Sequence, residues 1–412
     1  TNGHKSFIEL GGQTFLARCI EDLSKKDYSD VYIVLNQSSL EHPAITQLLE
    51  TYKTTALQIT CVVQENPTGM GDALLAVAKQ IPDITQEEYF GVIGAYTLNA
   101  GLVVSELESV IYNQDNPSSH AVLAAPTKEP WNYGILELAG ESPQAATPED
   151  AEPYIQQTTA IVEKPKAGKE PSNIKIQLAY VLGKSFWQTL THTAKDQYSF
   201  ETALNQTMKD ESVYAWVAPK SLPSLKYAWN LLRFQKTILQ AQEKTTIHPT
   251  ARVADSVIID DSTGPIVIDE QAQISDFAKI TGPAYIGKNV FVGDYSFIRQ
   301  SSIEKDATVG ANTELVRSVI LAGATVHFGY IADSIIGEQA KIGAGLITAN
   351  KRIDRGEIRT KLKGSMTETG KRQLGVIVGN KAQIGVGVRT MPGILISPES
   401  TILPGSVLDK NT

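Results

Sequence analysis

Residues 268–298 read "IDEQAQISDFAKITGPAYIGKNVFVGDYSFI", and their spacing determines the fold predicted for the second half of the chain. An aliphatic residue recurs at every sixth position, at Ile268, Ile274, Ile280, Ile286, Val292 and Ile298. Neither a helix nor an antiparallel hairpin sheet has a period of six. A hexapeptide repeat is typical of a left-handed parallel β-helix, in which each hexad is one strand and three strands form one triangular coil. We therefore predict that these side chains point into the interior of a prism.

The repeat continues, with a shift in phase, towards the end of the chain. It takes in Ile303, Val309, Leu315, Leu321, Ile336, Ile342, Val378, Ile384, Ile396 and Ile402. Small residues at Gly287, Gly293, Gly310, Gly337 and Gly343 are expected at the corners. The hexads suffice for roughly seven or eight coils within residues 246–412. An ordinary antiparallel β domain is the alternative, and the unbroken spacing disfavours it.

The first half has a different pattern. Short β-branched runs at 31–35, 59–63 and 120–126 read as buried strands, and residues 13–23 and 71–81 read as amphipathic helices. This alternation predicts an α/β domain over residues 1–221, with a mostly parallel sheet covered on both faces. Residues 141–153 are polar and proline-rich and predict a loop. Residues 222–243 predict a long helix, within a linker at 222–245.

Composition excludes several classes of protein. No apolar run is long enough to span a bilayer, and no signal peptide is visible at the start. A net charge of −8 argues against a nucleic-acid binder. Two cysteines, Cys19 and Cys61, cannot form a disulfide framework or a zinc site. We expect a cytoplasmic protein with no nucleic-acid or membrane partner.

Three motifs in the β-helix half carry a resemblance: "HFGYIADSIIG", "KIGAGLITAN" and "GKRQLGVIVGNKAQIGVGVRTMPG". They resemble the acetyltransferase half of bifunctional sugar-1-phosphate nucleotidyltransferase/N-acetyltransferases, of the N-acetylglucosamine-1-phosphate uridyltransferase type and its archaeal-like branch. The resemblance covers nearly all of residues 245–408. It implies a Rossmann-like nucleotidyltransferase domain ahead of the β-helix, acetyl-CoA as cosubstrate, and a homotrimer with the acetyl-transfer site between subunits.

By this resemblance, His327 is the base that takes a proton from the attacking amine, and Tyr330 and Asn350 position the sugar phosphate. Imidazole suits this step because it titrates near neutrality. Asp333 is expected to orient the imidazole, and backbone N–H groups of residues 343–345 are expected near the thioester oxygen. A surface histidine on a β-helix edge is the alternative interpretation of His327.

The segment 351–372 interrupts the hexads with eight basic and three acidic residues. A basic insertion beside the active coil suits coenzyme A or a sugar phosphate, while a solvated loop that blocks edge-to-edge stacking is equally consistent. Lys341 and Lys351 depart from residues common in relatives. The candidate binding residues are Asp333, Lys341, Lys351, Arg352, Lys361, Lys371 and Arg372.

The first half resembles the nucleotidyltransferase domain of the same proteins. The motifs are "HKSFIELGGQTFLARCIEDL", "QENPTGMGDALL", "NYGILEL" and "IVEKP". They imply nucleotide or sugar contacts at Lys5, Gln64, Gly69, Gly134, Glu163 and Lys164.

The nucleotidyltransferase pattern lacks parts that the chemistry needs. The first strand and its G-x-G-T-R loop are absent from the sequence, and the two positions expected to hold Mg²⁺ through aspartate read Ala95–Tyr96 and Ala218. Thr202 also stands where relatives often have aspartate. We therefore predict no metal site and a nucleotidyltransferase half that has lost its activity. The alternative is a set of relocated ligands, for instance Asp72, that keeps Mg²⁺-dependent use of UTP or dTTP.

The sequence therefore predicts an acetyl-CoA-dependent N-acetyltransferase of hexosamine 1-phosphates in sugar-nucleotide biosynthesis. Two alternatives stay open. One is an active sugar-1-phosphate nucleotidyltransferase, and the other is a non-catalytic scaffold or sensor of sugar nucleotides.

Overall fold

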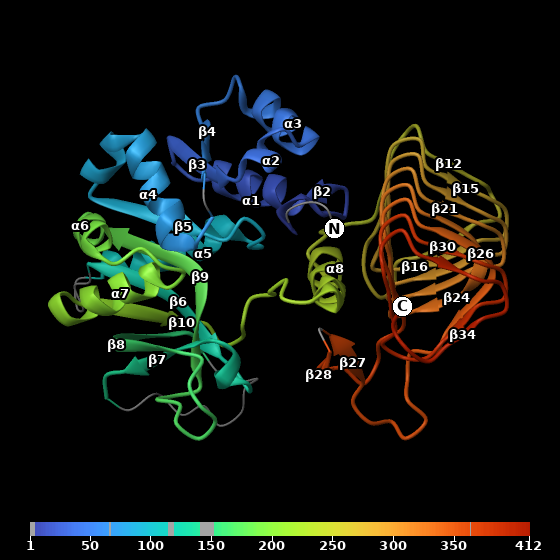
Figure 1. The fold of residues 1–412 in the computed structure, drawn as a ribbon. Helices are drawn as coiled ribbons and strands as arrows, with labels where there is room; N and C mark the ends of the chain where they lie inside the picture. Colours follow the sequence, from blue (N-terminus) through green and yellow to red (C-terminus); the bar gives the residue numbers. More distant parts are fainter. Residues whose placement is uncertain (1–4, 66, 114–118, 141–151, 363) are drawn as a thin grey trace. The chain divides into compact units, whose positions relative to one another are not determined.

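The computed structural model describes residues 5–65, 67–113, 119–140, 152–362 and 364–412, and these form two compact units (Figure 1). One unit is Phe15–Leu222, and the other joins the described residues up to Thr14 to Pro223–Thr412. This division differs from the expected boundaries, because the first hairpin and the linker helix pack with the β-helix. Most of the loop predicted at 141–153 lies outside the described residues.

The α/β unit is built on a six-stranded sheet in the order β5-β9-β6-β10-β8-β7. Its strands are β5 (Tyr89–Ile93), β6 (His120–Pro126), β7 (Gly134–Leu138), β8 (Tyr154–Glu163), β9 (Ile174–Gly183) and β10 (Val213–Val217). Two parallel strands, β3 (Asp30–Leu35) and β4 (Gln58–Val63), pair separately. The prediction of a mostly parallel sheet is wrong, since β9 runs antiparallel to both β5 and β6, and β8 runs antiparallel to β10 and β7. A strand buried on both faces has the same apolar pattern whichever way it runs.

Helices cover both faces of this sheet. Leu123 of β6 packs with α1 (Phe15–Ser24) and α5 (Ala100–Ile111), whereas Val122 packs on the opposite face with α4 (Met70–Gln80), α6 (Ser185–His192) and α7 (Ser199–Asp210). Both predicted helices are confirmed as α1 and α4, although Gln13–Thr14 forms strand β2. Two further helices, α2 (Gln37–Leu40) and α3 (Pro43–Tyr52), lie between β3 and β4 in the chain.

The second unit is a left-handed parallel β-helix with three faces. The first face is an eight-stranded sheet of β11 (Thr246–Ile247), β14 (Ile266–Ile268), β17 (Ala284–Ile286), β20 (Ser302–Ile303), β23 (Val319–Ile320), β25 (Ile335–Ile336), β29 (Ile377–Val378) and β32 (Leu395–Ile396). The second face contains β12 (Arg252–Val253), β15 (Gln273–Ile274), β18 (Phe291–Val292), β21 (Thr308–Val309), β24 (Thr325–Ala332), β26 (Lys341–Thr348), β30 (Gln383–Ile384) and β33 (Thr401–Ile402). The third contains β13 (Ile258–Asp260), β16 (Lys279–Thr281), β19 (Phe297–Arg299), β22 (Glu314–Val316), the far halves of β24 and β26, β31 (Arg389–Thr390) and β34 (Val407–Leu408).

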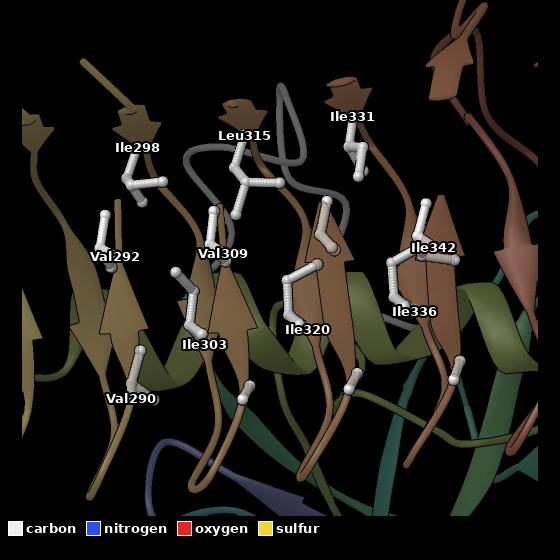
Figure 2. Packing of buried hydrophobic residues seen from close by; sticks show 14 of the residues in the cluster. Val290, Val292, Ile298, Ile303, Val309, Leu315, Ile320, Ile331, Ile336 and Ile342 are labelled. Carbon is white, nitrogen blue, oxygen red and sulfur yellow. The ribbon is translucent and has the colours of Figure 1, made fainter. Parts of the chain in front are cut away.

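The predicted aliphatic residues form the interior of the prism (Figure 2). One prediction is wrong: Ile320, not Leu321, belongs to this column and pairs with Ile303 below and Ile336 above. The cause is a corner shorter by one residue, so that the next interior position comes five positions after Leu315 instead of six. The eight strands of the first face agree with the predicted number of coils.

Glycine at the corners lets successive coils approach closely. A Cβ atom built on Gly310 would collide with the carbonyl oxygen of His327 in the next coil. A Cβ on Gly343 would lie 2.9 Å from the carbonyl oxygen of Ile384. The predicted role of these glycines is therefore confirmed by the lack of room for any side chain.

The first hairpin is bound to the β-helix through its turn. Strands β1 (Glu9–Leu10) and β2 (Gln13–Thr14) are joined by Gly11 and Gly12, whose φ angles are 62° and 79°. Their N–H groups donate to the two carboxyl oxygens of Glu304, at 2.9 and 3.1 Å, and Lys305 pairs with Glu9 at 2.7 Å. Two successive positive φ angles favour glycine, which adopts them without a steric penalty.

The linker helix is shorter than predicted. Helix α8 spans Leu231–Gln240 and contacts the β-helix, where Gln235 Nε2 donates to the carbonyl oxygen of Gln300 at 2.7 Å.

Glu304 is fully buried beneath the hairpin. Burial raises its pKa to about 7, while hydrogen bonds from Ser302 and the two glycines act in the opposite direction and Glu9 adds to the rise. Tyr285 also faces this carboxyl group, and its hydroxyl donates to Asp269 at 2.9 Å. The hairpin is thus attached through a group that titrates near neutrality.

We expect the free energy of unfolding to fall as pH rises from 4.5 to about 7, because folded Glu304 keeps a proton that the unfolded chain has released. The shift corresponds to about 3 kcal/mol. Above pH 7 the group is ionised in both states, so its contribution to the slope ends. Urea unfolding across this pH range measures the effect. Glu304→Gln should lose this slope, and Glu270→Gln, in an exposed pair with Lys288, should keep it. A wild-type curve without the decline would contradict the expectation.

Candidate active site

His327 lies on a corner of the β-helix, on a strand that bends. β24 pairs with β21 through Val326 and with β22 through Ile331, so the residues between them turn from the second face to the third. The register with β26 shifts at Phe328 and Gly329, which marks a bulge. His327 is exposed beside Phe328, and their ring centroids are 6.4 Å apart. The bulge therefore presents the imidazole on the outside of the coil, as a base would need to be.

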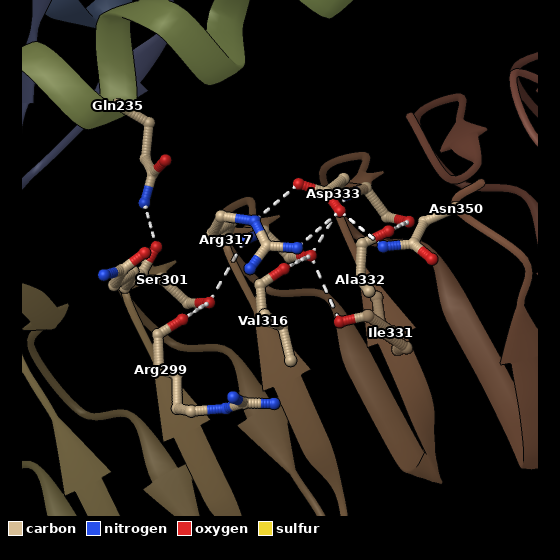
Figure 3. Close-up of polar contacts among 12 residues, drawn as sticks. Gln235, Arg299, Ser301, Val316, Arg317, Ile331, Ala332, Asp333 and Asn350 are labelled. Carbon is tan, nitrogen blue, oxygen red and sulfur yellow. Dashed lines mark hydrogen bonds and ion pairs between the residues drawn. The ribbon is translucent and has the colours of Figure 1, made fainter. Parts of the chain in front are cut away.

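Asp333 occupies the next corner along the same coil (Figure 3). Its Oδ1 and Oδ2 accept hydrogen bonds from Arg317 Nε and Nη2, both at 2.8 Å. Asn350 Nδ2 donates to Oδ2 at 2.6 Å. The carboxylate is 10% exposed. Asp333 is thus the centre of a network that links three successive passes of the chain around the prism.

A ladder of buried serines supports this corner. Ser318 N donates to Ser301 Oγ, and Ser334 N donates to Ser318 Oγ, each at 3.1 Å. Val376 N continues the ladder to Ser334 Oγ at 3.0 Å. Because each hydroxyl also donates to a carbonyl of its own coil, no polar group of the ladder lacks a partner. The backbone that holds Arg317 and Asp333 is therefore closely fixed.

The expected hydrogen bond from Asp333 to His327 is absent within the described residues, because Arg317 and Asn350 take both carboxylate oxygens. The two residues stand at the two ends of one face. Asp333 follows His327 by six positions along the chain, a span of up to roughly 20 Å. Within one chain the structure brings Asn350 to Asp333, with Tyr330 on the strand between, but leaves His327 at the other corner.

The basic insertion forms a hairpin of β27 (Arg359–Leu362) and β28 (Ser365–Glu368). Lys341, Lys351, Lys361 and Arg372 are exposed. Arg352 is exposed but paired with Asp354 at 2.8 Å, so its charge is already matched. These predicted binding residues are thus accessible cations, without a shared hydrogen-bond partner among the described residues.

Lys371 differs from the exposed Lys351 and Lys361 because it is half-buried. Burial lowers the pKa of its ammonium group, Arg233 and Lys236 of α8 lower it further, and Asp333 acts in the opposite direction. Lys371 therefore shares a cationic region with the linker helix, next to the Asp333 network.

Sequence reasoning missed Arg317, Arg233 and Lys236. A signal for Arg317 was present, since "RSVI" at 317–320 aligns with "DSII" at 333–336, one coil later. Equivalent positions of successive coils stack, so this alignment makes Arg317 and Asp333 neighbours. Nothing in the sequence indicated that helix α8 packs near Lys371.

Two groups of predicted nucleotide and sugar contacts are each brought together in the α/β unit. Gln64 Nε2 donates to the carbonyl oxygen of Gly69 at 3.1 Å and to Asp72 Oδ2 at 2.7 Å. Gly134 pairs with Glu163, and a Cβ on Gly134 would lie 2.8 Å from Glu163 Oε2. Lys5 belongs to the other compact unit.

The segment 197–201 lies between these two groups. A Cβ on Gly69 would lie 2.9 Å from the carbonyl oxygen of Gln197. The ammonium of Lys164 is 5.9 Å from the ring centroid of Tyr198 and 3.4 Å from Glu163. Burial raises the pKa of Glu201, and Glu163 adds to the rise. The predicted contacts thus converge on one polar region.

The positions expected to hold Mg²⁺ carry no acid. Ala95 and Tyr96 follow β5, and Ala218 follows β10 with its N–H donated to Ala124. Among the described residues, no group of three or more histidine, cysteine, aspartate or glutamate side chains is placed to hold a metal ion. The alternative ligand Asp72 is hydrogen-bonded to Gln64.

The sequence profile of the nucleotidyl transferase family matches residues 1–230. The chain belongs to this family. A bifunctional sugar-1-phosphate nucleotidylyltransferase/acetyltransferase of Sulfurisphaera tokodaii is 27% identical over 81% of this chain and 82% of the relative. A bifunctional protein GlmU of Methanococcus vannielii is 23% identical over 100% of this chain and 91% of the relative. An uncharacterized acetyltransferase YaiX of Escherichia coli is 33% identical over 46% of this chain and 85% of the relative.

These similarities confirm the predicted resemblance to bifunctional sugar-1-phosphate nucleotidyltransferase/acetyltransferases. In the part of the chain that the structure describes, no helix has the length and apolar character needed to cross a bilayer.

We predict that the Asp333 network contributes to the free energy of unfolding. Asp333→Ala leaves Arg317 and Asn350 without their acceptor in a mostly buried place, so we expect a loss of about 2 kcal/mol in unfolding free energy. Asp354→Ala breaks the exposed pair with Arg352 and should cause no measurable change, because water solvates both charges. Urea unfolding of both variants makes the comparison. Equal stability of the two would show that the network does not hold this corner.

Proposed function

We propose that this protein transfers the acetyl group of acetyl-CoA to the amine of a hexosamine 1-phosphate, as a step in sugar-nucleotide biosynthesis. The observation that supports it is the exposed imidazole of His327 on the β24 bulge, on a coil whose next corner holds Asp333, the acceptor that orders the amide of Asn350. A base and a polar positioning group on rigid strands are what amine acylation requires.

The reaction balances with these groups alone. The amine nitrogen attacks the thioester carbon, the N–C bond forms and the C–S bond breaks. The nitrogen gives its proton to His327, which returns it to the leaving thiolate as thiol. Tyr330, half-buried on the same strand, is proposed to contact the sugar phosphate.

The site needs a second copy of the chain. In one chain, His327 and Asn350 stand at opposite ends of the third face, too far apart to meet on one amine. A homotrimer in which the His327 corner of one copy meets the Asn350 corner of another completes the site. The family resemblance supports the same arrangement.

The corner that carries His327 also has room for an extended ligand. In the later coils, the residues with a left-handed backbone at this corner are glycines: Gly345, Gly387 and Gly405, with φ of 79°, 69° and 73°. No side chain rises from this edge at these three positions, so a pantetheine chain can lie along it. Lys341 of β26 and the exposed cations of the insertion, including Lys351, Lys361 and Arg372, are proposed to attract the phosphates of acetyl-CoA or of the sugar.

For the α/β unit we propose binding of a sugar phosphate or nucleotide through Gln64, Glu163 and Lys164, without nucleotidyl transfer. Alanine at 95 and 218 offers Mg²⁺ no anionic oxygen, which supports this proposal. An active enzyme using UTP or dTTP with Mg²⁺ is the second candidate, and Asp72 in the nucleotide loop is the feature that favours it. We further propose a cytoplasmic location.

We expect His327→Ala to lower thiol release from acetyl-CoA in the presence of glucosamine 1-phosphate by about a hundredfold or more, since general base catalysis supplies that much. Thiol appearance measures the rate. His248→Ala, an exposed histidine of the first coil, is the matched control and should retain full activity. Absence of thiol release from the wild-type protein would refute the proposal for this substrate.

We expect no pyrophosphate release when the wild-type protein is given UTP or dTTP, Mg²⁺ and a sugar 1-phosphate. The reason is the missing carboxylate at positions 95 and 218. Release that disappears in Asp72→Asn would instead establish a relocated metal site. Absence of both thiol release and pyrophosphate release would favour the non-catalytic scaffold or sensor.

A further inference from the structure

The corner at Asp333 fixes the direction of an amide. Asn350 Nδ2 donates to Asp333 Oδ2 at 2.6 Å. An ionised carboxylate only accepts hydrogen bonds, so the group of Asn350 that faces it is the NH₂ group. The carbonyl oxygen Oδ1 therefore points to the other side, as Figure 3 shows, and accepts no hydrogen bond within the described residues. Asn350 thus presents a hydrogen-bond acceptor that is only partly buried.

Arg317 in turn fixes Asp333. Its planar guanidinium binds both carboxylate oxygens at 2.8 Å, a fork that sets the plane of the carboxylate as well as its position. Rotation of Asp333 would break both of these bonds and the bond to Asn350. The two residues also have nearly the same left-handed backbone, with φ of 47° and 48°, and stack on successive coils.

The pairing of Arg317 joins two coils. Its guanidinium binds Asp333 on the next coil, whereas Arg352 pairs with Asp354 only two residues away in the same loop. The serine ladder behind Arg317 and Asp333 prevents the two coils from sliding relative to each other.

We propose that Arg317 is a positioning residue for acetyl transfer: acting through Asp333, it holds Asn350 with its carbonyl oxygen outward to accept an N–H of the substrate amine. This inference rests on the proposed function. It gives the site a chemical preference, since the outward oxygen favours a group that donates hydrogen bonds. A sugar with a free amine at this position satisfies it, whereas a ligand that offers only an acceptor is opposed by the lone pairs of Oδ1.

The test is Arg317→Lys, which keeps the charge but replaces the two-pronged fork with one compact donor. We expect KM for glucosamine 1-phosphate to rise about tenfold, with KM for acetyl-CoA unchanged, as is usual for loss of a residue that orients a ligand. A purely structural role would alter stability or both KM values. Arg299→Lys is the matched control, since Arg299 forms a similar pair with Glu314 on the coil below and should leave both constants unchanged.

Repeating the Arg317→Lys substitution in an Asn350→Ala variant tests whether Arg317 acts through Asn350. If Arg317 acts through Asn350, Arg317→Lys has no further effect there, because the amide that it orients is gone. Equal losses in both backgrounds, or a wild-type KM in the single variant, would overturn the inference. Should Arg317→Lys not fold, Arg317→Gln combined with Asp333→Asn removes both charges together and should produce the same rise in KM.

Calorimetric measurement of glucosamine 1-phosphate binding distinguishes failure of the positioning role of Arg317 from failure of the proposed function. A wild-type protein that binds and acetylates this ligand, with Arg317→Lys unaffected, refutes only the positioning role. A wild-type protein that neither binds nor acetylates it refutes the proposed function and this inference together.

Discussion

The structure of the β-helix depends on one constraint, the hydrogen bonding of each coil to the next in parallel register. Ile303, Ile320 and Ile336 pair in sequence, and the same register continues to Val378 and Ile396. Once this ladder is set, every position has a fixed neighbour above and below. Interior positions form an apolar column, and corner positions form vertical rows that contain glycine or other residues with a left-handed backbone. These rows position the residues of the candidate site, because Arg317 and Asp333 are neighbours only as equivalent corner positions of successive coils.

The same constraint explains what the sequence could and could not reveal. The hexad period predicts the β-helix, its interior residues and its glycine corners, since each follows from one repeated local pattern. It misplaced Leu321 because a corner can be one residue shorter without disturbing the strands. In the α/β unit, the apolar runs predict strands and helices, but not strand direction, because β9 is buried on both faces just as a parallel strand would be.

The candidate site divides in the same way. His327, Tyr330 and Asn350 were recognisable from motifs. The motif that contains Asp333 does not include its partner Arg317, which becomes visible only when the residues of one coil, 317–320, are aligned with those of the next, 333–336. Long-range packing could not be predicted from local patterns either. The contact of Gly11 and Gly12 with Glu304 joins residues almost three hundred positions apart, and no local pattern indicates it.

The basic insertion has a consequence for how such a protein can change. Ser334 and Val376 are 42 residues apart in the chain, yet they are hydrogen-bonded as direct neighbours in the stack. The chain leaves the prism at one corner, forms a hairpin, and returns to the next strand in register. The exposed part of that excursion can therefore vary in length and charge while the register of the coils stays the same. A scaffold of this kind separates the part that must be conserved for folding from the part that chooses a ligand, so new specificities can be gained by exchanging a loop.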